Sequence, residues 1–139
     1  MVGCLSVKTV TVAAGVLIEG GRVLLSQRLT GTHLAGLWEF PGGKVEEGED
    51  PRDTVARELR EEVGIETAAT EILEVTFYKY AEKSVLLLFF ACHRLPDSPD
   101  PRPIHVAAVR WAAANELDER VFPPADLEIL RKVSRLLSA

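Results

Sequence analysis

Cysteine, positive charge and long apolar runs are all scarce in this chain of 139 residues. The two cysteines, Cys4 and Cys92, fit no metal-ligand spacing, so we expect free thiols in a reducing compartment. A formal net charge of -5 argues against a basic surface that binds nucleic-acid polymers. The apolar run from Val85 to Cys92 is too short to span a bilayer, and we expect no signal peptide. These absences predict a cytoplasmic protein without a membrane partner.

Apolar residues are abundant enough for one core. They make up 47% of the chain, and its length predicts a single domain over residues 1–139. Runs of β-branched and alternating residues predict strands at 8–18, 23–27, 37–40, 71–80, 84–93 and 107–111. The first two should form a hairpin around residues 19–22. Residues 86–90 are expected in a central strand buried on both faces.

Two helices are predicted. The first runs from about Pro51 to Val63, with Asp50 as its N-cap and Gly64 just past its end. The second is the amphipathic C-terminal segment, preceded by a helical turn at residues 115–117. Its expected apolar face consists of Leu127, Ile129, Leu130, Val133, Leu136 and Leu137. Strands between two such helices predict an α/β fold, an α/β/α sandwich with a mixed β-sheet between the helices.

The stretch 36–65 is the most unusual part of the chain, because eight acids fall between Glu46 and Glu62. At helical spacing, Val55, Ala56, Leu59 and Val63 share one arc, and Glu58, Glu61 and Glu62 share the neighbouring arc. A solvated acidic face is the simpler explanation. However, these acids border the buried arc, and Arg57 and Arg60 are placed to hold the outer ones. Oxygen ligands of this kind bind Mg²⁺ or Mn²⁺, so we predict a divalent-metal site.

This stretch resembles the Nudix box, G-x5-E-x7-R-E-U-x-E-E-x-G-U, in which U is a bulky aliphatic residue. The match covers Gly43, Glu49, Arg57, Glu58, Leu59, Glu61, Glu62, Gly64 and Ile65 without a departure. The preceding residues 37–44, LWEFPGGK, resemble the MutT-type branch, which cleans the nucleotide pool and so protects DNA. The resemblance implies a Nudix fold and a metal-dependent hydrolase. Water would attack the β-phosphorus of a nucleoside triphosphate, giving a monophosphate and pyrophosphate.

The resemblance also implies roles for individual residues of the box. Glu58, Glu61 and Glu62 would hold Mg²⁺, with Mn²⁺ as the alternative ion, and the carbonyl of Gly42 would be a further ligand. Arg57 is expected to orient a carboxylate through a bidentate pair rather than touch the substrate. Glu49 is expected either to help bind the metal itself or to contact the residues that bind it.

Phosphate contacts are expected outside the acidic helix. Arg28 ends the second predicted strand, at a position that faces the nucleotide in MutT-type proteins, and a surface arginine is the alternative. Lys44 is a candidate for a second phosphate contact. His33 lies in the loop after Arg28, and we predict that it stands outside the site.

One position departs from the family pattern. MutT-type proteins usually carry a glutamate, serving as metal ligand or base, six residues before the tryptophan that stands here as Trp111. This chain has His105 there. Neutral imidazole can bind Mn²⁺ and act as a base, whereas Mg²⁺ prefers oxygen. His105 is therefore a candidate metal ligand, a strand residue with no role in catalysis being the alternative, and the general base is left open.

The segment 122–126 is expected to recognise the base. In MutT-type proteins the residue after Pro-Pro-Ala reads the purine edge and is often asparagine, whereas here it is Asp126. An N-cap role for Asp126 is compatible with that. As a carboxylate it would accept hydrogen bonds from base N–H groups, such as N4 of cytosine or the N1 and N2 edge of oxidised guanine. The expected substrate is therefore a damaged or modified dNTP, 8-oxo-dGTP first and 5-substituted dCTP second.

The walls of the base pocket are expected to come from Val10, Val12, Phe40 and Tyr80, although Phe40 is also a candidate core residue. Three alternatives to this function remain. A Nudix hydrolase of another nucleoside diphosphate derivative should carry further motifs, and none is recognised. A non-catalytic nucleotide-binding Nudix module should have lost box carboxylates, and a purely structural acidic domain would not match nine positions. The chain is expected to act as a monomer or homodimer.

Overall fold

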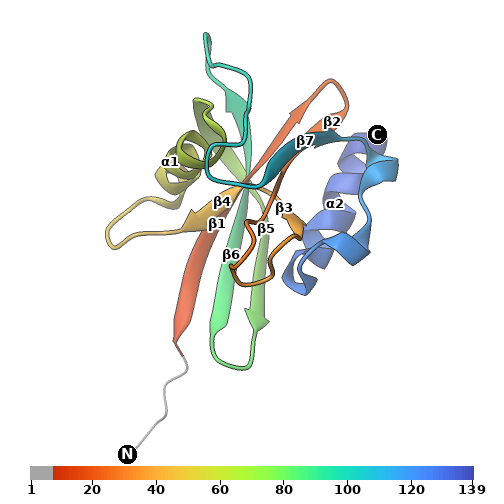
Figure 1. The fold of residues 1–139 in the computed structure, drawn as a ribbon. Helices are drawn as coiled ribbons and strands as arrows, with labels where there is room; N and C mark the ends of the chain where they lie inside the picture. The colour runs from red at the N-terminus through yellow and green to blue at the C-terminus, as the bar shows by residue number, and fades with distance from the viewer. Residues whose placement is uncertain (1–7) are drawn as a thin grey trace, which may run out of the picture.

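The computed structural model describes residues 8–139, so Cys4 lies outside the described part. These residues form one mixed sheet with a long helix on each face (Figure 1). The strands and helices follow in the order β1 Thr9–Glu19, β2 Arg22–Gln27, β3 Trp38–Glu39, β4 Gly42–Lys44, α1 Pro51–Val63, β5 Thr67–Lys79, β6 Ser84–Arg94, β7 Ala108–Ala112 and α2 Leu127–Ser138. Short 3-10 turns cover Ala114–Glu116, Glu119–Val121 and Pro124–Asp126. The α/β/α architecture predicted from the sequence is confirmed.

β1 and β6 form the centre of the sheet and run parallel, in register from Thr9 opposite Ser84 to Leu17 opposite Cys92. β1 is antiparallel to β2 and β4, and β5 is antiparallel to β6. β6 is central, as expected, but residues 86–88 are only partly buried. At this end the strands extend beyond α1, which leaves the residues less covered (Figure 1). Phe77, which pairs with Leu86, is 57% exposed there.

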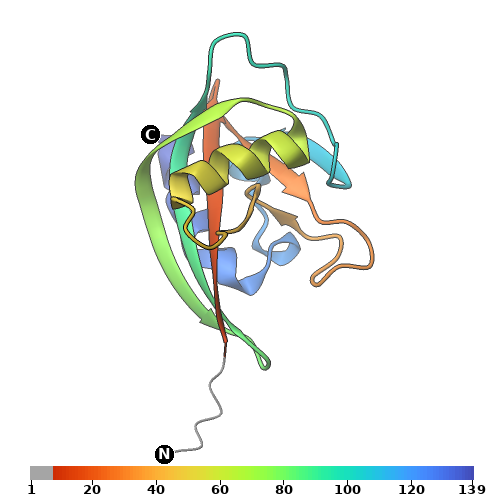
Figure 2. The ribbon, with the colours of Figure 1, turned by 90° about the vertical axis from the view of Figure 1, so that its left-hand side faces the viewer.

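Each face of the sheet carries its own hydrophobic cluster. Val55, Leu59 and Val63 of α1 pack with Leu17 and Phe90 on one face. On the other face α2 packs with residues of β1, β2 and β6, and the view turned by 90° shows α1 lying in front of the sheet (Figure 2). In α2 the predicted apolar face is correct for Ile129, Leu130 and Val133. It is wrong for Leu136, which lies near the C-terminal end of the helix and is 46% exposed.

The predicted boundaries of α1 are confirmed at both ends. The Asp50 side chain accepts a hydrogen bond of 2.9 Å from the backbone amide of Arg52, and Gly64 ends the helix at φ 71°. Residues 41–43 have the turn-like composition Pro-Gly-Gly, yet only Pro41 lies outside a strand. Gly42 and the next residue belong to β4 and pair with β1, and a Cβ on Gly42 would overlap the backbone of Ala13.

Neither helix of the described residues has the length and apolar character needed to cross a membrane. Cys92 is a buried free thiol, and burial raises its pKa to about 12. It therefore has the properties of an unreactive core residue, as its isolated position in the sequence suggested.

Candidate active site

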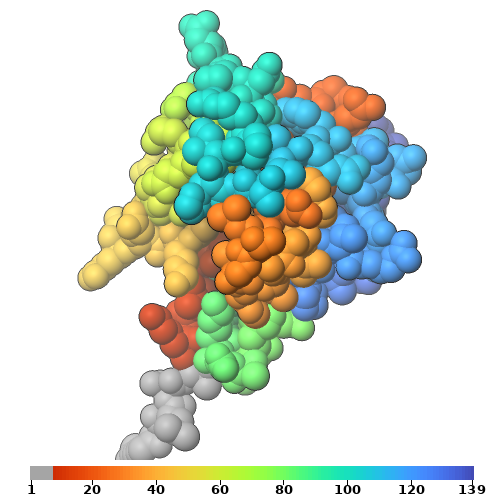
Figure 3. Space-filling view, in the orientation of Figure 1, coloured from red at the N-terminus to blue at the C-terminus, as the bar shows by residue number. Residues whose placement is uncertain are grey.

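A pocket of about 290 Å³ opens on the α2 side of the sheet, between the loop after β2 and the turn that joins β5 to β6. These two segments lie side by side on the face shown in Figure 3, and the ring of His33 meets the ring of Tyr80 edge-on at 5.3 Å. The volume is close to the lower end of the range for ligand pockets. The pocket lining includes Val10, Val12, Arg28, His33, Leu34, Glu39, Phe40, Gly42, Gly43, Lys44, Tyr80, Lys83, Leu87, Phe89, Ala125 and Asp126.

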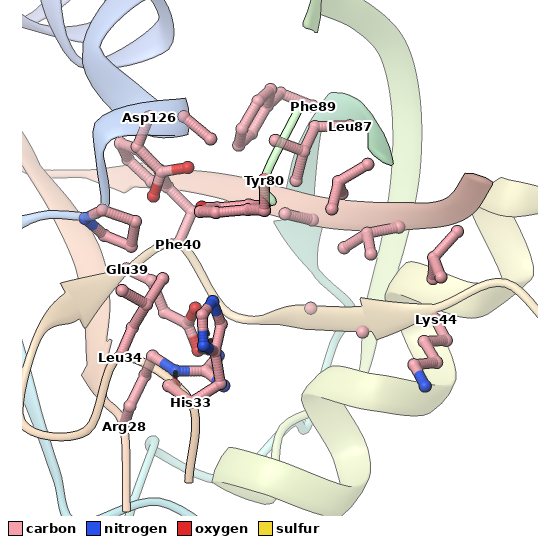
Figure 4. Close-up of a pocket in the computed structure, with 18 of the residues that line it drawn as sticks. Arg28, His33, Leu34, Glu39, Phe40, Lys44, Tyr80, Leu87, Phe89 and Asp126 are labelled. Atoms are coloured by element: carbon pink, nitrogen blue, oxygen red, sulfur yellow. Dashed lines mark hydrogen bonds and ion pairs between the residues drawn. The ribbon is translucent and has the colours of Figure 1, made fainter. Parts of the chain in front are cut away.

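The two ends of this pocket differ in polarity. Figure 4 shows Lys44, the last residue of the short strand β4, at one end and Asp126 at the other, beside the ring of Phe40. Phe40 is 3% exposed, and its ring lies 6.1 Å from that of Phe89, so it belongs to the core and to the pocket wall at once. The predicted lining by Val10 and Val12 also matches the structure.

Glu58 and Glu62 lie one turn apart on α1, with Glu58 directly against β4. A Cβ on Gly43 would overlap the carboxylate of Glu58, so a larger residue at this position would displace that carboxylate. One carboxylate oxygen of Glu62, Oε1, is buried and has no hydrogen-bond partner among residues 8–139. Burial, followed by the adjacent Glu58, raises the pKa of Glu62 well above its ordinary value. These two acids form the buried part of the acidic helix face.

Glu61 lies on the exposed side of the same face. Its side chain is 56% exposed, and its Oε2 is 3.4 Å from Nη1 of Arg57. Arg57 also donates to Glu58 at 3.0 Å and forms a bidentate pair with Glu49 at 2.9 and 3.1 Å. Arg60 does not hold the box acids, as the sequence had suggested, because its guanidinium pairs with Glu66.

Glu49 is fixed from three sides in the loop before α1. Arg57 binds it, the Thr54 hydroxyl donates to its Oε1 at 2.7 Å, and the amide of Glu46 donates to the same oxygen at 3.1 Å. These hydrogen bonds lower the pKa of Glu49 to about 2, with the pair to Arg57 as the first cause. Glu49 is therefore an anion at every physiological pH.

The carboxylates suit a hard divalent cation, although in residues 8–139 no three ligand side chains are already gathered around one point. The buried oxygen of Glu62 lacks a partner among the described residues, and the carboxyl of Glu58 lies beside it. Buried polar atoms are normally satisfied, so an unpaired oxygen here favours an external cation. The donor atoms are oxygens, which Mg²⁺ and Mn²⁺ prefer. Glu58 and Glu62 would be the inner ligands.

His105 contacts this helix through its backbone amide. The amides of His105 and Ile104 both donate to the carbonyl of Glu62, each at 3.0 Å, and the amide of Arg102 donates to that of Val63. The imidazole of His105 belongs to an exposed residue. Segment 102–105 therefore caps the C-terminal carbonyls of the acidic helix, while metal binding by the His105 ring remains a prediction.

Arg28 lines the pocket, but its guanidinium is occupied within the protein. Nη1 donates to both carboxylate oxygens of Glu39, at 3.0 and 3.2 Å, and Nε donates to the carbonyl of His33 at 2.7 Å. Arg28 thus holds the loop 29–36 against β3. A direct phosphate contact by Arg28 remains a prediction, because reaching a phosphate requires the remaining N–H groups or a break in this network.

Sequence reasoning missed Glu39 and placed His33 outside the site, whereas both residues line the pocket. Glu39 lies between Trp38 and Phe40, and an acid between two aromatic residues of a short strand was the available signal. Burial raises its pKa, and the ion pair with Arg28 opposes that shift. His33 carried no comparable signal, because its contact with Tyr80 joins loops 47 positions apart in the chain.

A model of the NUDIX domain matches residues 8–133. The chain belongs to the NUDIX family. This Nudix protein is similar to the 8-oxo-dGTP diphosphatase of Haemophilus influenzae, with 35% identity over 91% of this chain and 92% of the relative. It is equally similar to the CTP pyrophosphohydrolase of Escherichia coli, with 35% identity over 95% and 96% of the two chains.

Solved structures show the same relationship. The solution structure of the E. coli ORF135 protein superimposes on this Nudix chain with a TM-score of 0.76 and 32% identity, covering 96% of this chain and 93% of that one. The crystal structure of the MutT protein from Methanosarcina mazei has a TM-score of 0.80 at 23% identity, covering 98% and 100%. The second likeness supports the fold alone. The chain is thus a Nudix hydrolase of the MutT-like type.

Proposed function

We propose that this Nudix hydrolase converts a nucleoside triphosphate and water into a nucleoside monophosphate and pyrophosphate. The observation that carries the proposal is the buried, partnerless oxygen of Glu62 beside Glu58, next to a pocket of about 290 Å³. Two relatives named for acting on a nucleoside triphosphate, at 35% identity each, support the same reaction. Attack at the β-phosphorus is the expected route.

The residues of the site divide this work between them. A divalent metal, when bound, supplies positive charge against the polyphosphate and acidifies water. Glu58 and Glu62 would hold it with Glu61 and the Gly42 carbonyl, and Arg57 keeps Glu58 oriented while Glu49 fixes Arg57. These contacts keep the acids in place before substrate arrives, which is what electrostatic preorganisation requires.

The polarity of the pocket suggests how the nucleotide lies. Lys44, at the end of β4, is near the acidic helix and would contact phosphate, whereas Asp126, Phe40 and Tyr80 enclose the opposite end, shown in Figure 4. Aromatic and apolar walls suit a base, and a cationic end suits phosphates. The triphosphate would therefore extend from the base end toward β4 and α1.

We propose an oxidised or otherwise modified dNTP, 8-oxo-dGTP first, as the substrate in the cytoplasmic nucleotide pool. A 5-substituted dCTP is the second candidate, because Asp126 can accept from N4 of cytosine and one relative is named a CTP pyrophosphohydrolase. Neither a nucleic-acid polymer nor a membrane is expected as a partner, in keeping with the net charge of -5. The chain would act as a single domain.

A substrate panel tests this proposal. Nucleoside triphosphates, nucleotide sugars and dinucleoside polyphosphates would be incubated with Mg²⁺ or Mn²⁺, and monophosphate and pyrophosphate release measured. Glu62→Gln should reduce turnover about a hundredfold or more, because it removes an inner metal ligand without changing side-chain size. Glu66→Gln, on the exposed pair with Arg60, is the matched control. Normal turnover in Glu62→Gln, or a preference for diphosphate sugars, would contradict the proposal.

A further inference from the structure

β5 is an edge strand of the sheet, paired with β6 on one side only, and Figure 2 shows it as the outermost strand on the left. From Glu74 to Lys79 it pairs with β6 without interruption. Within residues 8–139, the backbone groups of this stretch that point away from β6 meet no further strand. An unpaired edge of this kind is a template on which another strand can add.

The two halves of this edge differ in how well they are protected. The first half, up to Leu73, contains two register shifts, and cationic side chains occupy its carbonyls. Nε of Arg52 donates to the carbonyl of Thr70, and Nζ of Lys132 donates to that of Leu73. Bulges and cations are common means of preventing edge pairing. Residues 74–78 contain no lysine, proline or register shift, so this half is open.

The open half exposes two large apolar side chains on one face. Val75 is 52% exposed and Phe77 is 57% exposed. Val75 pairs with Leu88, which packs against the cluster on the α1 side, so both side chains lie on that face of the sheet. The strands extend beyond α1 here, as Figure 1 shows. Single exposed apolar residues are ordinary, but a pair on an unprotected edge indicates a contact surface.

The opposite face of the same five residues is polar. Glu74, Thr76 and Tyr78 alternate with the apolar pair and therefore point to the α2 side. Oε1 of Glu74 lies 3.7 Å from Nζ of Lys132 on that helix, which agrees with this placement. Residues 74–78 thus read acid, valine, threonine, phenylalanine, tyrosine, with Thr76 in the middle.

We propose that residues 74–78 of β5 pair antiparallel with the same residues of a second copy of this chain, with Thr76 on the two-fold axis. Val75 of each copy then lies opposite Phe77 of the other, a β-branched residue against an aromatic ring. Glu74 lies opposite Tyr78, whose hydroxyl can donate to the carboxylate. The two-fold axis repeats each of these pairs, and the two sheets join into one.

The segment itself selects this register. A shift by one position places the apolar face of one copy against the polar face of the other. A shift by two positions moves the pairing into the bulge at Leu73 or onto the charge of Lys79. Only the register centred on Thr76 pairs all five residues 74–78 with one another. This self-complementarity is the reason to assign the edge to a second copy rather than to a strand of another protein.

Sedimentation velocity tests the association. The wild type should sediment as a dimer at about 100 µM and dissociate on dilution, as expected for a small interface. Val75→Lys and Phe77→Lys should each raise the dissociation constant by about tenfold or more. Leu136→Lys is the matched control, because Leu136 is also an exposed apolar residue, at 46%, but lies on α2. Circular dichroism should show wild-type folding in all three variants.

Outcomes of that experiment decide the proposal in both directions. A wild type that is monomeric at this concentration would overturn it and leave the edge to a strand of another protein. A dimer that both β5 variants leave intact would overturn it as well, because the contact would then lie elsewhere. Neither result depends on hydrolysis, so the proposed function stands or fails separately.

Oxidative cross-linking tests the register. Thr76→Cys should form a disulfide across the two-fold axis on treatment with diamide, because directly opposite residues have Cα atoms about 5 Å apart. Tyr78→Cys is the control, since its two copies would be about 14 Å apart, four residues along the strand. Both variants would carry Cys4→Ser, and Cys92 is buried. Cross-linking of Tyr78→Cys alone, or of neither variant, would overturn the proposed pairing.

Discussion

Arg57 joins the acidic helix to the loop before it through one guanidinium. It contacts Glu49, Glu58 and Glu61 and also donates to the carbonyl of Lys44 at 3.1 Å. These contacts explain why the box needs arginine here, because a planar group with five donors can serve several acceptors at fixed angles. Arg57 thus holds three carboxylates in the structure, and we expect it to act through them.

We expect Arg57→Lys to impair both stability and turnover. A lysine ammonium cannot reproduce the bidentate pair with Glu49 while reaching Glu58, so the free energy of unfolding should fall by about 1–2 kcal/mol. Turnover should fall at least tenfold, and the Mg²⁺ concentration for half-maximal rate should rise. Denaturant unfolding and Mg²⁺ titration of the rate measure these effects, and wild-type values in both would contradict the role given to Arg57.

Arg28 offers a second test at the residue scale. If it acts by holding Glu39 and the loop 29–36, then Arg28→Lys should be impaired nearly as much as Arg28→Ala, because one ammonium cannot pair with both oxygens of Glu39 and also reach His33. If it acts as a phosphate-binding charge, lysine should restore most of kcat/KM. Comparison of the two variants on one triphosphate decides between these roles.

At the element scale, α1 owes its position to both its ends. Asp50 caps its start, and segment 102–105 binds the last carbonyls, which a helix cannot satisfy by itself. Arg102 and Ile104 also lie over Gly64, where a Cβ would be 2.7 Å from each side chain. A loop between β6 and β7 thereby holds the helix turn that carries Glu62.

Substitutions at His105 distinguish the role of its backbone amide from the role of its imidazole. His105→Pro removes the amide that binds the Glu62 carbonyl, and we expect a loss of about 1 kcal/mol in stability with weaker Mn²⁺ binding. His105→Ala keeps that amide and should retain most of both. Mn²⁺ binding by electron paramagnetic resonance and exchange of the last α1 amides measure the difference. Equal losses of Mn²⁺ affinity in the two variants would instead favour the imidazole as a ligand.

Local patterns predicted the elements well and their contacts less well. α1 was predictable because Pro51 and Gly64 are strong start and stop signals, and the box acids because their spacing is fixed within one helix. Strand β4 was missed because Gly42 reads as a turn residue until its pairing with Ala14 is known. The same limit hid Glu39 and His33, whose roles depend on Arg28 and Tyr80 from distant segments.

For the whole molecule, a buried acid makes stability depend on pH. The pKa of Asp126 is raised from its ordinary 3.8 to about 8 in the fold, so the folded protein binds more protons than the unfolded chain between these values. Its contribution to stability is fully present below pH 3.8 and is lost as pH rises toward 8, with a limiting slope of about 1.4 kcal/mol per pH unit.

Asp126→Asn should remove this dependence, because asparagine does not ionise. The free energy of unfolding of the variant, relative to the wild type, should therefore increase from pH 5 to pH 8. Urea unfolding of both proteins without added metal measures this difference. A constant difference across that range would show that Asp126 keeps an ordinary pKa in the folded state.

The acidic helix is expected to direct water to the β-phosphorus of a nucleoside triphosphate. Hydrolysis of 8-oxo-dGTP with Mg²⁺ in ¹⁸O-labelled water, followed by mass spectrometry of both products, tests it most directly. The expected products are a nucleoside monophosphate without label and pyrophosphate carrying one ¹⁸O atom. Label in the monophosphate, or release of nucleoside diphosphate and inorganic phosphate, would contradict it.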